Sequence, residues 1–542
     1  MNKKLIISLL SIVLLSLEVS LTAGCSNKDE MKIPDNEINA ALEAGKTFHS
    51  DKPLKFSILY LDNPAYPMKN DWLLWSEVTK RTNVSLKIVS VPYDEYNEKR
   101  SLLISTGDAP YIITKTYPGS EEAYISSGAI LPVSDYAKFM PNYEKKIKAW
   151  NLKNELKTIT QADGKYYVLP GVHEKARYDY SLLIRKDIFN KEGLRVPATW
   201  EEVYEAAKTL KARYPDIYPL SDRWKTDALT NFMAPTFGVM AGWGAGNGIK
   251  YDSSKDSFFF YPTTNEYKDF INYFSRMVAE GLMDPESFTQ SDDEAKHKFE
   301  SGKAFMITSN IQETLALQQT MEKNLGKDKI QLLHMRNPQG PKGDVAYSSR
   351  LENGIIIPSN AKGNPDFISM IEFIDWLWYS DEGQELTKWG AQGITYTKAD
   401  DGTRTFVHGI NFNNLSKSPT TIDKDLRKDF GFSNGVFSYG GTEELKTSMM
   451  NDLERTFQKE MADKKTLSPS PPILYDEAER EAVNMKGALL MEYVKAQTIK
   501  FMTGNEPLAN WNQFLAQCKA KGSEDLVKQA NEVYNRTKHR LK

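Results

Sequence analysis

Short apolar runs alternate along the chain with longer segments in which apolar residues recur every three or four positions. Runs at 53–61, 83–91 and 111–114 predict buried strands, and the segments between them predict helices, the second over 93–106. This order is typical of a parallel sheet in an α/β domain. Ligands of such sheets bind beyond the carboxyl ends of the strands.

The same alternation returns later in the chain. We expect strands at 181–185, 304–308 and 355–358, and helices over 200–212 and 367–378. From 451 onward the pattern is mainly helical, with helices predicted around 478–502 and 510–537. The fold class that follows is α/β, with two α/β regions and a helical C-terminal region.

The first residues have the pattern of an export signal. Lys3 and Lys4 precede an apolar run over 5–17, which is too short to span a bilayer comfortably. Cys25 directly follows Ala23 and Gly24, and this arrangement resembles the lipobox of bacterial lipoproteins. The resemblance implies a signal peptide over 1–24, lipidation of Cys25 and a location on the extracellular face of the cell membrane. The alternatives are an ordinary secretory signal or an uncleaved anchor.

Composition narrows the class of protein. The chain has 542 residues, of which 40% are hydrophobic and 26% are charged, as in globular proteins. Lys and Arg number 69 against 72 Asp and Glu, and this balance argues against a nucleic-acid partner. Two cysteines exclude a disulfide scaffold and a Cys-rich zinc site, and we assign no role to Cys518.

Signatures of common enzymes do not occur in the sequence. There is no Walker A, G-x-G-x-x-G, G-x-S-x-G or H-E-x-x-H motif, and the six histidines lack metal-ligand spacing. Because many active sites have no local signature, this absence is only weak evidence against an enzyme; we expect a protein without catalytic activity, cofactor or metal.

Four segments, in order, resemble the extracellular solute-binding proteins of ABC importers, in the maltose-binding-protein class. Among them are Thr199-Trp200-Glu201-Glu202 and Gly302-Lys303-Ala304, and the four occur within 105–133, 164–202, 299–306 and 366–393. The closing segment from Phe501 to Trp511 is similar to that of large Gram-positive lipoproteins linked to oligosaccharide uptake.

The resemblance implies a periplasmic-binding-protein-like fold, with two α/β lobes, a hinge and a central ligand cleft. A flexible tether would occupy 25–52. Lobe 1 would comprise 53–172 and about 334–385, and the second lobe about 180–330 and about 390–542. Hinges are expected at 173–180 and about 334.

The implied function is capture of a carbohydrate, in particular an oligosaccharide, and its delivery to the transmembrane subunits of an ABC permease. The protein would be a monomer held to the membrane by its lipid. The alternatives are a peptide-binding or sensory protein of the same fold, or a polysaccharide-degrading enzyme.

Members of that subfamily often carry a calcium loop soon after the Thr-Trp-Glu-Glu helix. Calcium takes about six or more oxygen ligands, mainly from closely spaced Asp, Asn or Glu. In 211–220 Asp216 is the one acidic residue, so we expect no structural calcium there.

Candidate ligand contacts are polar and aromatic residues in the loops where strands end. Sugars present hydroxyl groups and one apolar ring face, so their sites combine planar polar groups with aromatic platforms. Lys115, Arg177, Arg223 and Arg350 would suit an acidic saccharide, although salt bridges are the more ordinary explanation. The candidates are Asp62, Asn63, Tyr66, Lys115, Tyr117, His173, Glu174, Arg177, Tyr178, Arg223, Trp224, Trp243, Asn310, Gln312, Arg350 and Glu352.

Overall fold

The structure, a computed structural model, describes residues 43–413, 415–416 and 423–541. The expected signal peptide, Cys25 and the tether up to residue 42 lie outside the described residues. Of the helices in the described ranges, none is long and apolar enough to cross a membrane.

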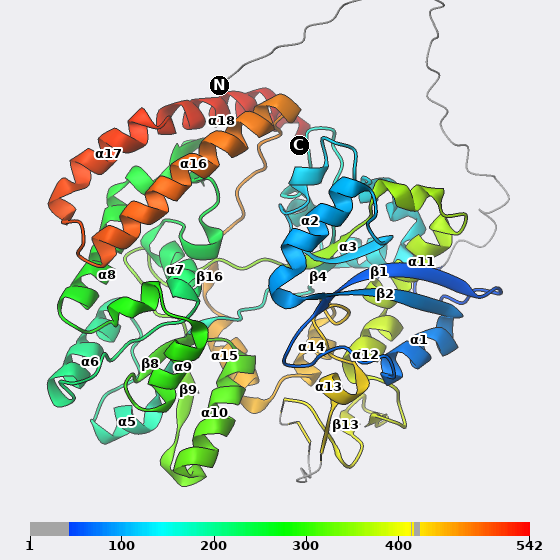
Figure 1. Cartoon of the computed structure of the whole chain (residues 1–542), viewed down its shortest axis with the longest axis horizontal. Coiled ribbons are helices and arrows are strands. Elements are labelled where there is room, and N and C mark those ends of the chain that lie inside the picture. Colours follow the sequence, from blue (N-terminus) through cyan, green and yellow to red (C-terminus); the bar gives the residue numbers. More distant parts are fainter. Residues whose placement is uncertain (1–42, 414, 417–422, 542) are drawn as a thin grey trace, which may run out of the picture. The chain divides into compact units, whose positions relative to one another are not determined.

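The buried apolar side chains form two large clusters, and we name the lobes after them. Lobe 1 comprises 43–172, 351–413 and 423–449, and lobe 2 comprises 181–335 and 475–541. The mixed α/β architecture predicted from the sequence is confirmed (Figure 1).

Lobe 1 is built on a five-stranded sheet in the order β2-β1-β3-β11-β4. β1 pairs in parallel with β2 and β3, which confirms the parallel arrangement predicted for the first three strands. β11 arrives from later in the chain and pairs antiparallel with β3 and β4. Ile58, Leu59 and Tyr60 of β1 are fully buried, because helices cover both faces of the sheet (Figure 1). The sheet and its helices are β1 Leu54–Asp62, α1 Leu73–Thr82, β2 Val84–Pro92, α2 Tyr96–Thr106, β3 Ile112–Thr116, α3 Pro141–Ala149, α4 Lys153–Lys157, β4 Leu169–Val172, β11 Leu351–Ile356, α11 Phe367–Tyr379 and α12 Asp381–Trp389.

The segment after α12 packs on lobe 1, although we expected 390–542 to belong to the second lobe. Phe437 contacts the rings of Tyr60 and Trp378, and the Trp72 indole donates to the Lys428 carbonyl oxygen. Apolar spacing indicates that a segment is buried but not which sheet it covers. The sequence therefore could not predict to which lobe this segment belongs. Its elements are β12 Tyr396–Lys398, β13 Arg404–Phe406, β14 Ile410–Asn411, β15 Lys424–Asp425, α13 Leu426–Phe430 and α14 Glu443–Ser448.

Lobe 2 contains a three-stranded antiparallel sheet, β8-β5-β9, surrounded by helices. The C-terminal helices α16, α17 and α18 lie along one side of this lobe (Figure 1). Its elements are β5 Ser181–Arg185, α5 Lys186–Lys191, α6 Trp200–Arg213, α7 Asp227–Met233, β6 Ile249–Asp252, β7 Ser257–Phe260, α8 Asn265–Ala279, α9 Asp292–Glu300, β8 Met306–Ser309, α10 Ile311–Leu325, β9 Leu332–His334, α16 Glu477–Met502, α17 Trp511–Ala520 and α18 Ser523–Thr537.

Cys518 belongs to the core that these C-terminal helices build. Its side chain is fully buried in the cluster that also contains Phe501, Trp511 and Phe514. Burial raises the pKa of the thiol to about 12, so the reactive thiolate is disfavoured. Cys518 therefore acts as a small apolar packing group.

The chain passes between the lobes three times, through the crossing segments 173–180, 336–350 and 450–474. The third crossing was not foreseen. It carries α15 Asp452–Met461 and β16 Lys465–Thr466, and β16 pairs in parallel with β10 Val345–Ala346 of the second crossing. The three crossings meet in a small apolar cluster of Ala346, Phe457 and Met461, against which Tyr178 packs.

A lysine ammonium holds the loop for which we expect no calcium. Lys211, near the end of α6, donates from Nζ to the carbonyl oxygens of Pro215 at 2.7 Å and Ile217 at 2.8 Å. The same ammonium lies 5.1 Å from the centre of the Tyr218 ring. A cationic side chain thus gathers the loop's carbonyl oxygens, and the expected absence of calcium stays a prediction.

We predict that Lys211→Met lowers the free energy of unfolding by about 1–2 kcal/mol, because two carbonyl oxygens lose a charged donor. Urea unfolding would measure this, with Lys208→Met on the exposed face of the same helix as the control. Calcium or a chelator should leave the melting temperature of the wild-type protein unchanged. A calcium-dependent rise in that temperature, or equal effects of the two substitutions, would contradict this interpretation.

Candidate ligand-binding cleft

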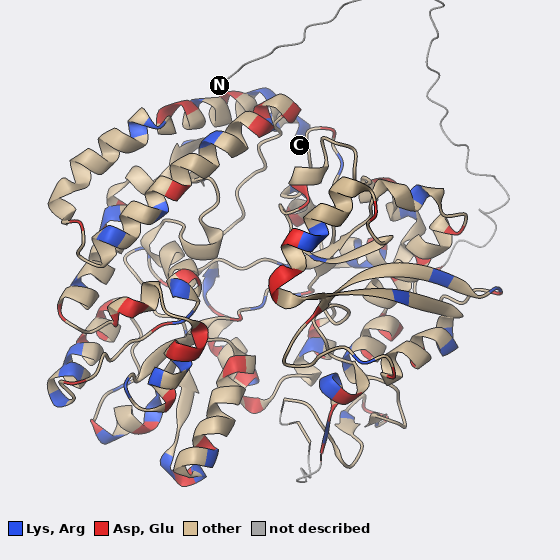
Figure 2. Ribbon diagram, in the orientation of Figure 1, with Lys and Arg blue, Asp and Glu red and all other residues tan. Residues whose placement is uncertain are grey.

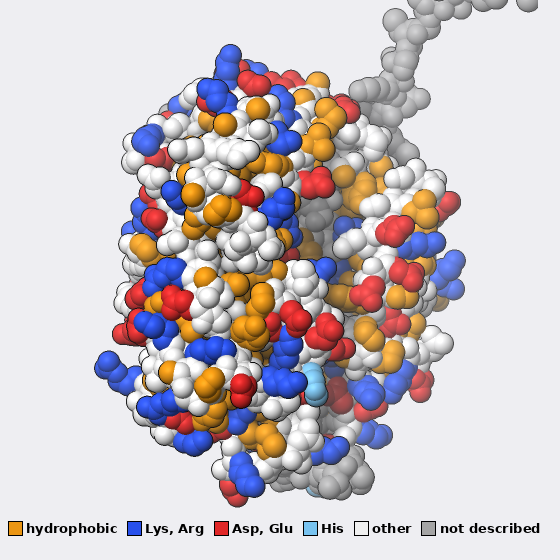
Figure 3. All heavy atoms as spheres, turned by 60° about the vertical axis from the view of Figure 1, so that its left-hand side comes forward, with side chains coloured by type: hydrophobic (Ala, Val, Ile, Leu, Met, Phe, Trp, Pro, Cys, Tyr) orange, Lys and Arg blue, Asp and Glu red, His pale blue; other side chains and the backbone are white. Residues whose placement is uncertain are grey.

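Two adjoining cavities lie where the crossing segments meet the lobes. His173, Arg177 and Glu352 line both, so the cavities share one wall, and we call the two together the cleft. The surface is hollowed between the two lobes in Figure 3. The first cavity, of about 290 Å³, is the basic pocket, and it is also lined by Tyr66, Gln312, Lys388, Phe412, Arg427, Asn434, Ser438, Tyr439, Lys446 and Glu454 among others. The second, of about 450 Å³, is the aromatic pocket, and it is also lined by Tyr117, Tyr178, Asp179, Tyr180, Phe232, Met240, Trp243 and Tyr347 among others.

The shared wall is built around the carboxylate of Glu352. It lies 2.7 Å from His173 Nε2 and accepts a hydrogen bond of 3.2 Å from the backbone N–H of Gly440. Gly440 has φ +68°, and a β-carbon there would lie 2.7 Å from the Val172 carbonyl oxygen. Glycine is therefore required where this loop passes close to β4.

The pair of His173 and Glu352 consists of a neutral ring and an ionised carboxylate. Burial lowers the pKa of His173, so the imidazole is uncharged at neutral pH and donates from Nε2. Burial alone would raise the pKa of Glu352, but His173, Lys115 and the Gly440 N–H lower it to about 2. The shared wall thus holds a stable negative charge.

Arg177 occupies the centre of the wall and is held by two carboxylates. Its guanidinium lies 2.9 Å from Asp179 and 2.5 Å from Glu454 of α15. Burial opposes its charge, yet the pKa of Arg177 is raised, because these carboxylates and Glu352 surround it. The Arg177–Glu454 pair joins the first crossing segment to the third.

Three further cations line the basic pocket. Lys388 of α12 is 6% exposed, and its Nζ has no hydrogen-bond partner among the described residues. Arg427 of α13 stacks on the rings of Tyr66 and Phe412, each at 4.8 Å. Lys446 of α14 is buried and donates to the Lys175 carbonyl oxygen at 3.3 Å. Burial lowers the pKa of each of these three groups, and that of Lys388 falls to about 7.

The charge of the basic pocket is a local feature. Lys and Arg are interspersed with Asp and Glu over both lobes in Figure 2. An anionic ligand would therefore be held by contacts inside the pocket rather than by a field over a whole face.

Exposed aromatic rings distinguish the aromatic pocket. Tyr117, Trp243 and Tyr347 are 57%, 50% and 48% exposed. Edge contacts position Trp243 against Tyr180 at 5.1 Å and against Trp224 at 5.8 Å between ring centres. These rings offer flat apolar faces at fixed positions.

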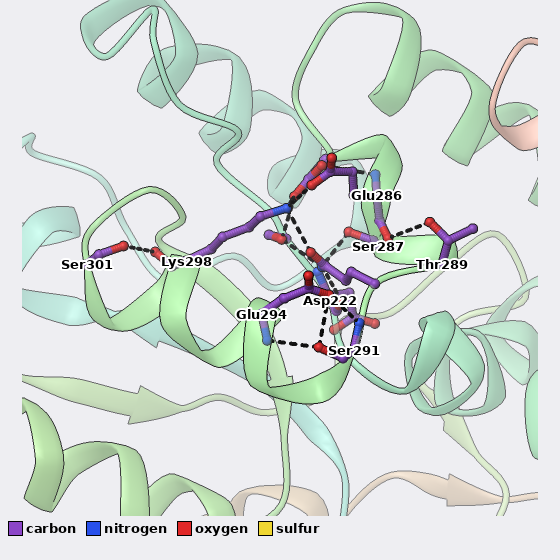
Figure 4. Close-up of polar contacts among 11 residues, drawn as sticks. Asp222, Glu286, Ser287, Thr289, Ser291, Glu294, Lys298 and Ser301 are labelled. Carbon is purple, nitrogen blue, oxygen red and sulfur yellow. Dashed lines mark hydrogen bonds and ion pairs between the residues drawn. The ribbon is translucent and has the colours of Figure 1, made fainter.

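Hydrogen bonds of the buried Asp222 fix the loop that carries Arg223 and Trp224. This buried carboxylate accepts from the Thr308 backbone N–H at 2.8 Å, and the Asp222 N–H donates to Ser287 Oγ at 2.8 Å. Lys298 donates to neighbouring side chains of the same network, among them Glu286 (Figure 4). The network holds Trp224 where it supports Trp243.

Some of the candidate contacts predicted from the sequence line the cleft and others do not. Those that line it are Tyr66, Tyr117, His173, Arg177, Tyr178, Trp243, Gln312 and Glu352. Two others lie close behind it. The Lys115 Nζ lies 3.4 Å from the position that a β-carbon on Gly435 would take, and Trp224 lies behind Trp243.

The remaining candidates make contacts that stabilise the fold. Asp62 and Asn63 accept backbone N–H bonds within their own loop, and Asn310 caps α10. Glu174 accepts from the backbone N–H of Glu443 at 2.7 Å, in α14.

Two of the candidate arginines are held in ion pairs. Arg350 pairs with Glu155 and donates to the Trp150 carbonyl oxygen at 2.8 Å. Arg223 pairs with Asp292 at 3.2 Å and Glu313 at 2.8 Å, and its guanidinium stacks on Trp224 at 3.9 Å.

The sequence did not indicate the pocket cations. Lys388 lies at a buried position of a charged helix, where no local motif distinguishes it from a surface lysine. Arg427 and Lys446 belong to the segment that we had assigned to the second lobe. Tyr180 could have been found, because it directly follows Tyr178 and Asp179 in the first crossing.

Two lobes, joined by three crossing segments, frame a cleft lined by polar and aromatic side chains, an arrangement that suits a binding protein. Residues 69–385 match the family model described as bacterial extracellular solute-binding protein. The chain belongs to this family.

Several relatives match over almost the whole chain. The polygalacturonan/rhamnogalacturonan-binding protein YtcQ of Bacillus subtilis (strain 168) is 24% identical over 540 residues, covering 98% of this chain and 99% of that one. Lipoprotein LipO of the same strain is 23% identical over 548 residues, covering 97% and 98%. The crystal structure of the alginate-binding protein AlgQ2 has the same fold, with a TM-score of 0.69 and 19% identity over 91% of this chain and 100% of that one.

We predict that Arg223→Met lowers the free energy of unfolding by about 2–3 kcal/mol. The carboxylates of Asp292 and Glu313 are partly buried, and both lose their ion-pair partner. Arg276 is the matched control, since it also stacks on an aromatic ring and pairs with one carboxylate, but on the surface. Arg276→Met should cost less than about 1 kcal/mol. Chemical unfolding of both variants would test this, and equal losses would show that Arg223 is not a structural residue.

Proposed function

We propose that this protein is the substrate-binding component of an ABC importer and that it captures an oligosaccharide in the cleft. The observation that carries the proposal is the shared wall of His173, Arg177 and Glu352. It joins a pocket of exposed aromatic rings to a pocket dense in polar and charged groups. A saccharide presents both an apolar ring face and many hydroxyl groups, so it needs this combination.

The relatives support a saccharide as the ligand. YtcQ is named for polygalacturonan and rhamnogalacturonan, and AlgQ2 is named for alginate. Polygalacturonan and alginate are polymers of uronic acids. The ligand class that we propose therefore includes acidic oligosaccharides.

Capture would proceed by closure of the lobes about the crossing segments. Arg427 of lobe 1 donates to the Gln312 side chain of lobe 2 at 3.2 Å. A saccharide that touches both lobes favours the closed arrangement through contacts that the open one lacks. The division into two moving lobes is part of this proposal.

We further propose that the protein is lipid-anchored through Cys25 on the extracellular face of the cell membrane. LipO, which matches over nearly its whole length, is named as a lipoprotein. Two or more acyl chains suffice for stable attachment to a membrane.

Peptide binding, sensing and saccharide cleavage are the other functions open to this fold. The family and the similar solved structures are binding proteins. No particular observation favours cleavage, and Glu352 and Glu454 are both held by other residues of the wall. Saccharide turnover by the purified protein would support cleavage over capture.

A thermal-shift screen tests the proposed function. We expect an oligosaccharide to raise the melting temperature, with about 2.7 kcal/mol of added stability at 100 times its Kd. The panel contains neutral oligosaccharides, trigalacturonate, trimannuronate and peptides. Trp243→Ala should weaken binding of the active sugar about tenfold or more, because a ring platform is lost.

Tyr218→Ala is the control for Trp243→Ala, because Tyr218 is an exposed aromatic residue outside the cleft. It should leave saccharide binding unchanged. A shift with peptides and with no saccharide would refute the proposed function.

The lipid anchor has its own test. Cys25→Ala should release the protein from the membrane into the medium of the producing cells, because the acceptor thiol is lost. Cys518→Ala is the control and should stay in the membrane fraction, since that thiol is buried in lobe 2. Retention of the Cys25→Ala protein in the membrane would rule out this anchor.

A further inference from the structure

The carboxylates of the basic pocket already have partners, whereas two of its cations, Lys388 and Arg427, have no ion pair among the described residues. Glu352 is bound by His173 and Gly440, and Glu454 is paired with Arg177. Lys446 lies 3.8 Å from Glu443, so Lys388 and Arg427 are the cations of the described pocket lining that have no carboxylate partner. Both of these cations are available to an anionic group of a ligand.

Lys388 is the clearest sign of the missing group. Its side chain is 94% buried and lines the pocket, but its ammonium has no hydrogen-bond partner among the described residues. A buried ammonium without a partner is strongly unfavourable, and native proteins keep such a group where it has a further role. A negatively charged ligand oxygen would supply the hydrogen-bond acceptor and the counter-charge that the described residues do not give Lys388.

Arg427 is presented to the same pocket by uncharged groups. Its guanidinium lies between the rings of Tyr66 and Phe412 and donates to the Ser433 carbonyl oxygen at 2.9 Å. The stacking fixes the plane of the guanidinium. A fixed guanidinium plane matches the planar, two-oxygen geometry of a carboxylate.

The aromatic pocket indicates what kind of molecule carries this carboxylate. The exposed rings of Tyr117, Trp243 and Tyr347 lie on the other side of the shared wall. A chain of sugar rings running from the aromatic pocket into the basic pocket would bring its substituents to Lys388 and Arg427.

We propose that the basic pocket binds the carboxylate of a uronic acid residue in the captured saccharide, and that Lys388 provides its main ion pair. This inference rests on the proposed capture of a saccharide. It adds the chemical class of one sugar unit and the direction in which the ligand lies in the cleft.

The surroundings of Lys388 make such binding depend on pH. Burial lowers the pKa of Lys388 to about 7, and the nearby cations Lys146, Lys446 and Arg177 act in the same direction, whereas Glu352 acts against them. Other charged or titratable groups that line or adjoin the pocket are Lys115, His173, Arg427 and Glu454. A bound carboxylate favours the ammonium form, so binding above this pH requires uptake of a proton.

The experiment compares each uronate trimer, trigalacturonate and trimannuronate, with its methyl ester, in which every carboxylate is neutral. Isothermal titration of the full mature protein should show that the preferred acid binds at least about tenfold more tightly than its ester. Affinity for the acid should fall about fivefold from pH 7 to pH 8, because the ammonium fraction of Lys388 falls by that factor, while affinity for the ester should not change.

Lys388→Met removes the charge and keeps the length of the side chain. We expect it to abolish the preference for the acid over the ester. The melting temperature without ligand should stay the same or rise, because an unpaired buried charge is removed. Lys398→Met, which removes a lysine paired with Glu385 outside the cleft, should leave the preference intact.

Equal binding of acid and ester by the wild-type protein would overturn the carboxylate site but leave saccharide capture standing. So would binding of neutral oligosaccharides alone, or a Lys388→Met protein that keeps the preference. If no saccharide of any kind binds, both the proposed function and the carboxylate site are refuted. The wild-type comparison of acid with ester decides the question even if a variant does not fold.

Discussion

The structure depends on the way its three crossing segments are held to one another. Ala346, Phe457, Met461 and Tyr178 form a small apolar core from all three, and the Arg177–Glu454 pair joins the first to the third. Lys464 of the third crossing has a fully buried side chain and pairs with Asp344 of the second. Because the crossings pack against one another, they form one connected floor of the cleft and not three independent linkers.

The packing of the crossing segments explains where polar groups can be buried with little loss of folding free energy. In the floor, His173 is hydrogen-bonded to Glu352 and Arg177 is ion-paired with Glu454, so these polar groups stabilise one another in the wall. On the lobe 1 side of the basic pocket, Lys388 is buried without such a partner in the part of the chain that the structure describes. This difference distinguishes residues that build the cleft from the residue that we propose as a ligand contact.

The sequence predicted those features that have a local pattern. The parallel strands β1–β3 and the long helix α16 follow from apolar spacing. Trp243, which lines the aromatic pocket, was selected because it lies in a glycine-rich loop. The third crossing was missed because α15 has the amphipathic pattern of an ordinary surface helix, and nothing in it marks a contact with Tyr178. Arg223 and Arg350 were selected for their charge, but whether an arginine meets a ligand or an internal carboxylate is decided by the tertiary fold.

The threefold passage of the chain has a consequence for how the protein is made. Lobe 1 cannot complete its core until residues near 449 are available, and the core of lobe 2 includes Val533, close to the end of the chain. Domains built from one continuous segment can fold in turn as they emerge during synthesis. Here neither lobe can do so, and an export machinery that takes unfolded chains would receive this one before either core has closed.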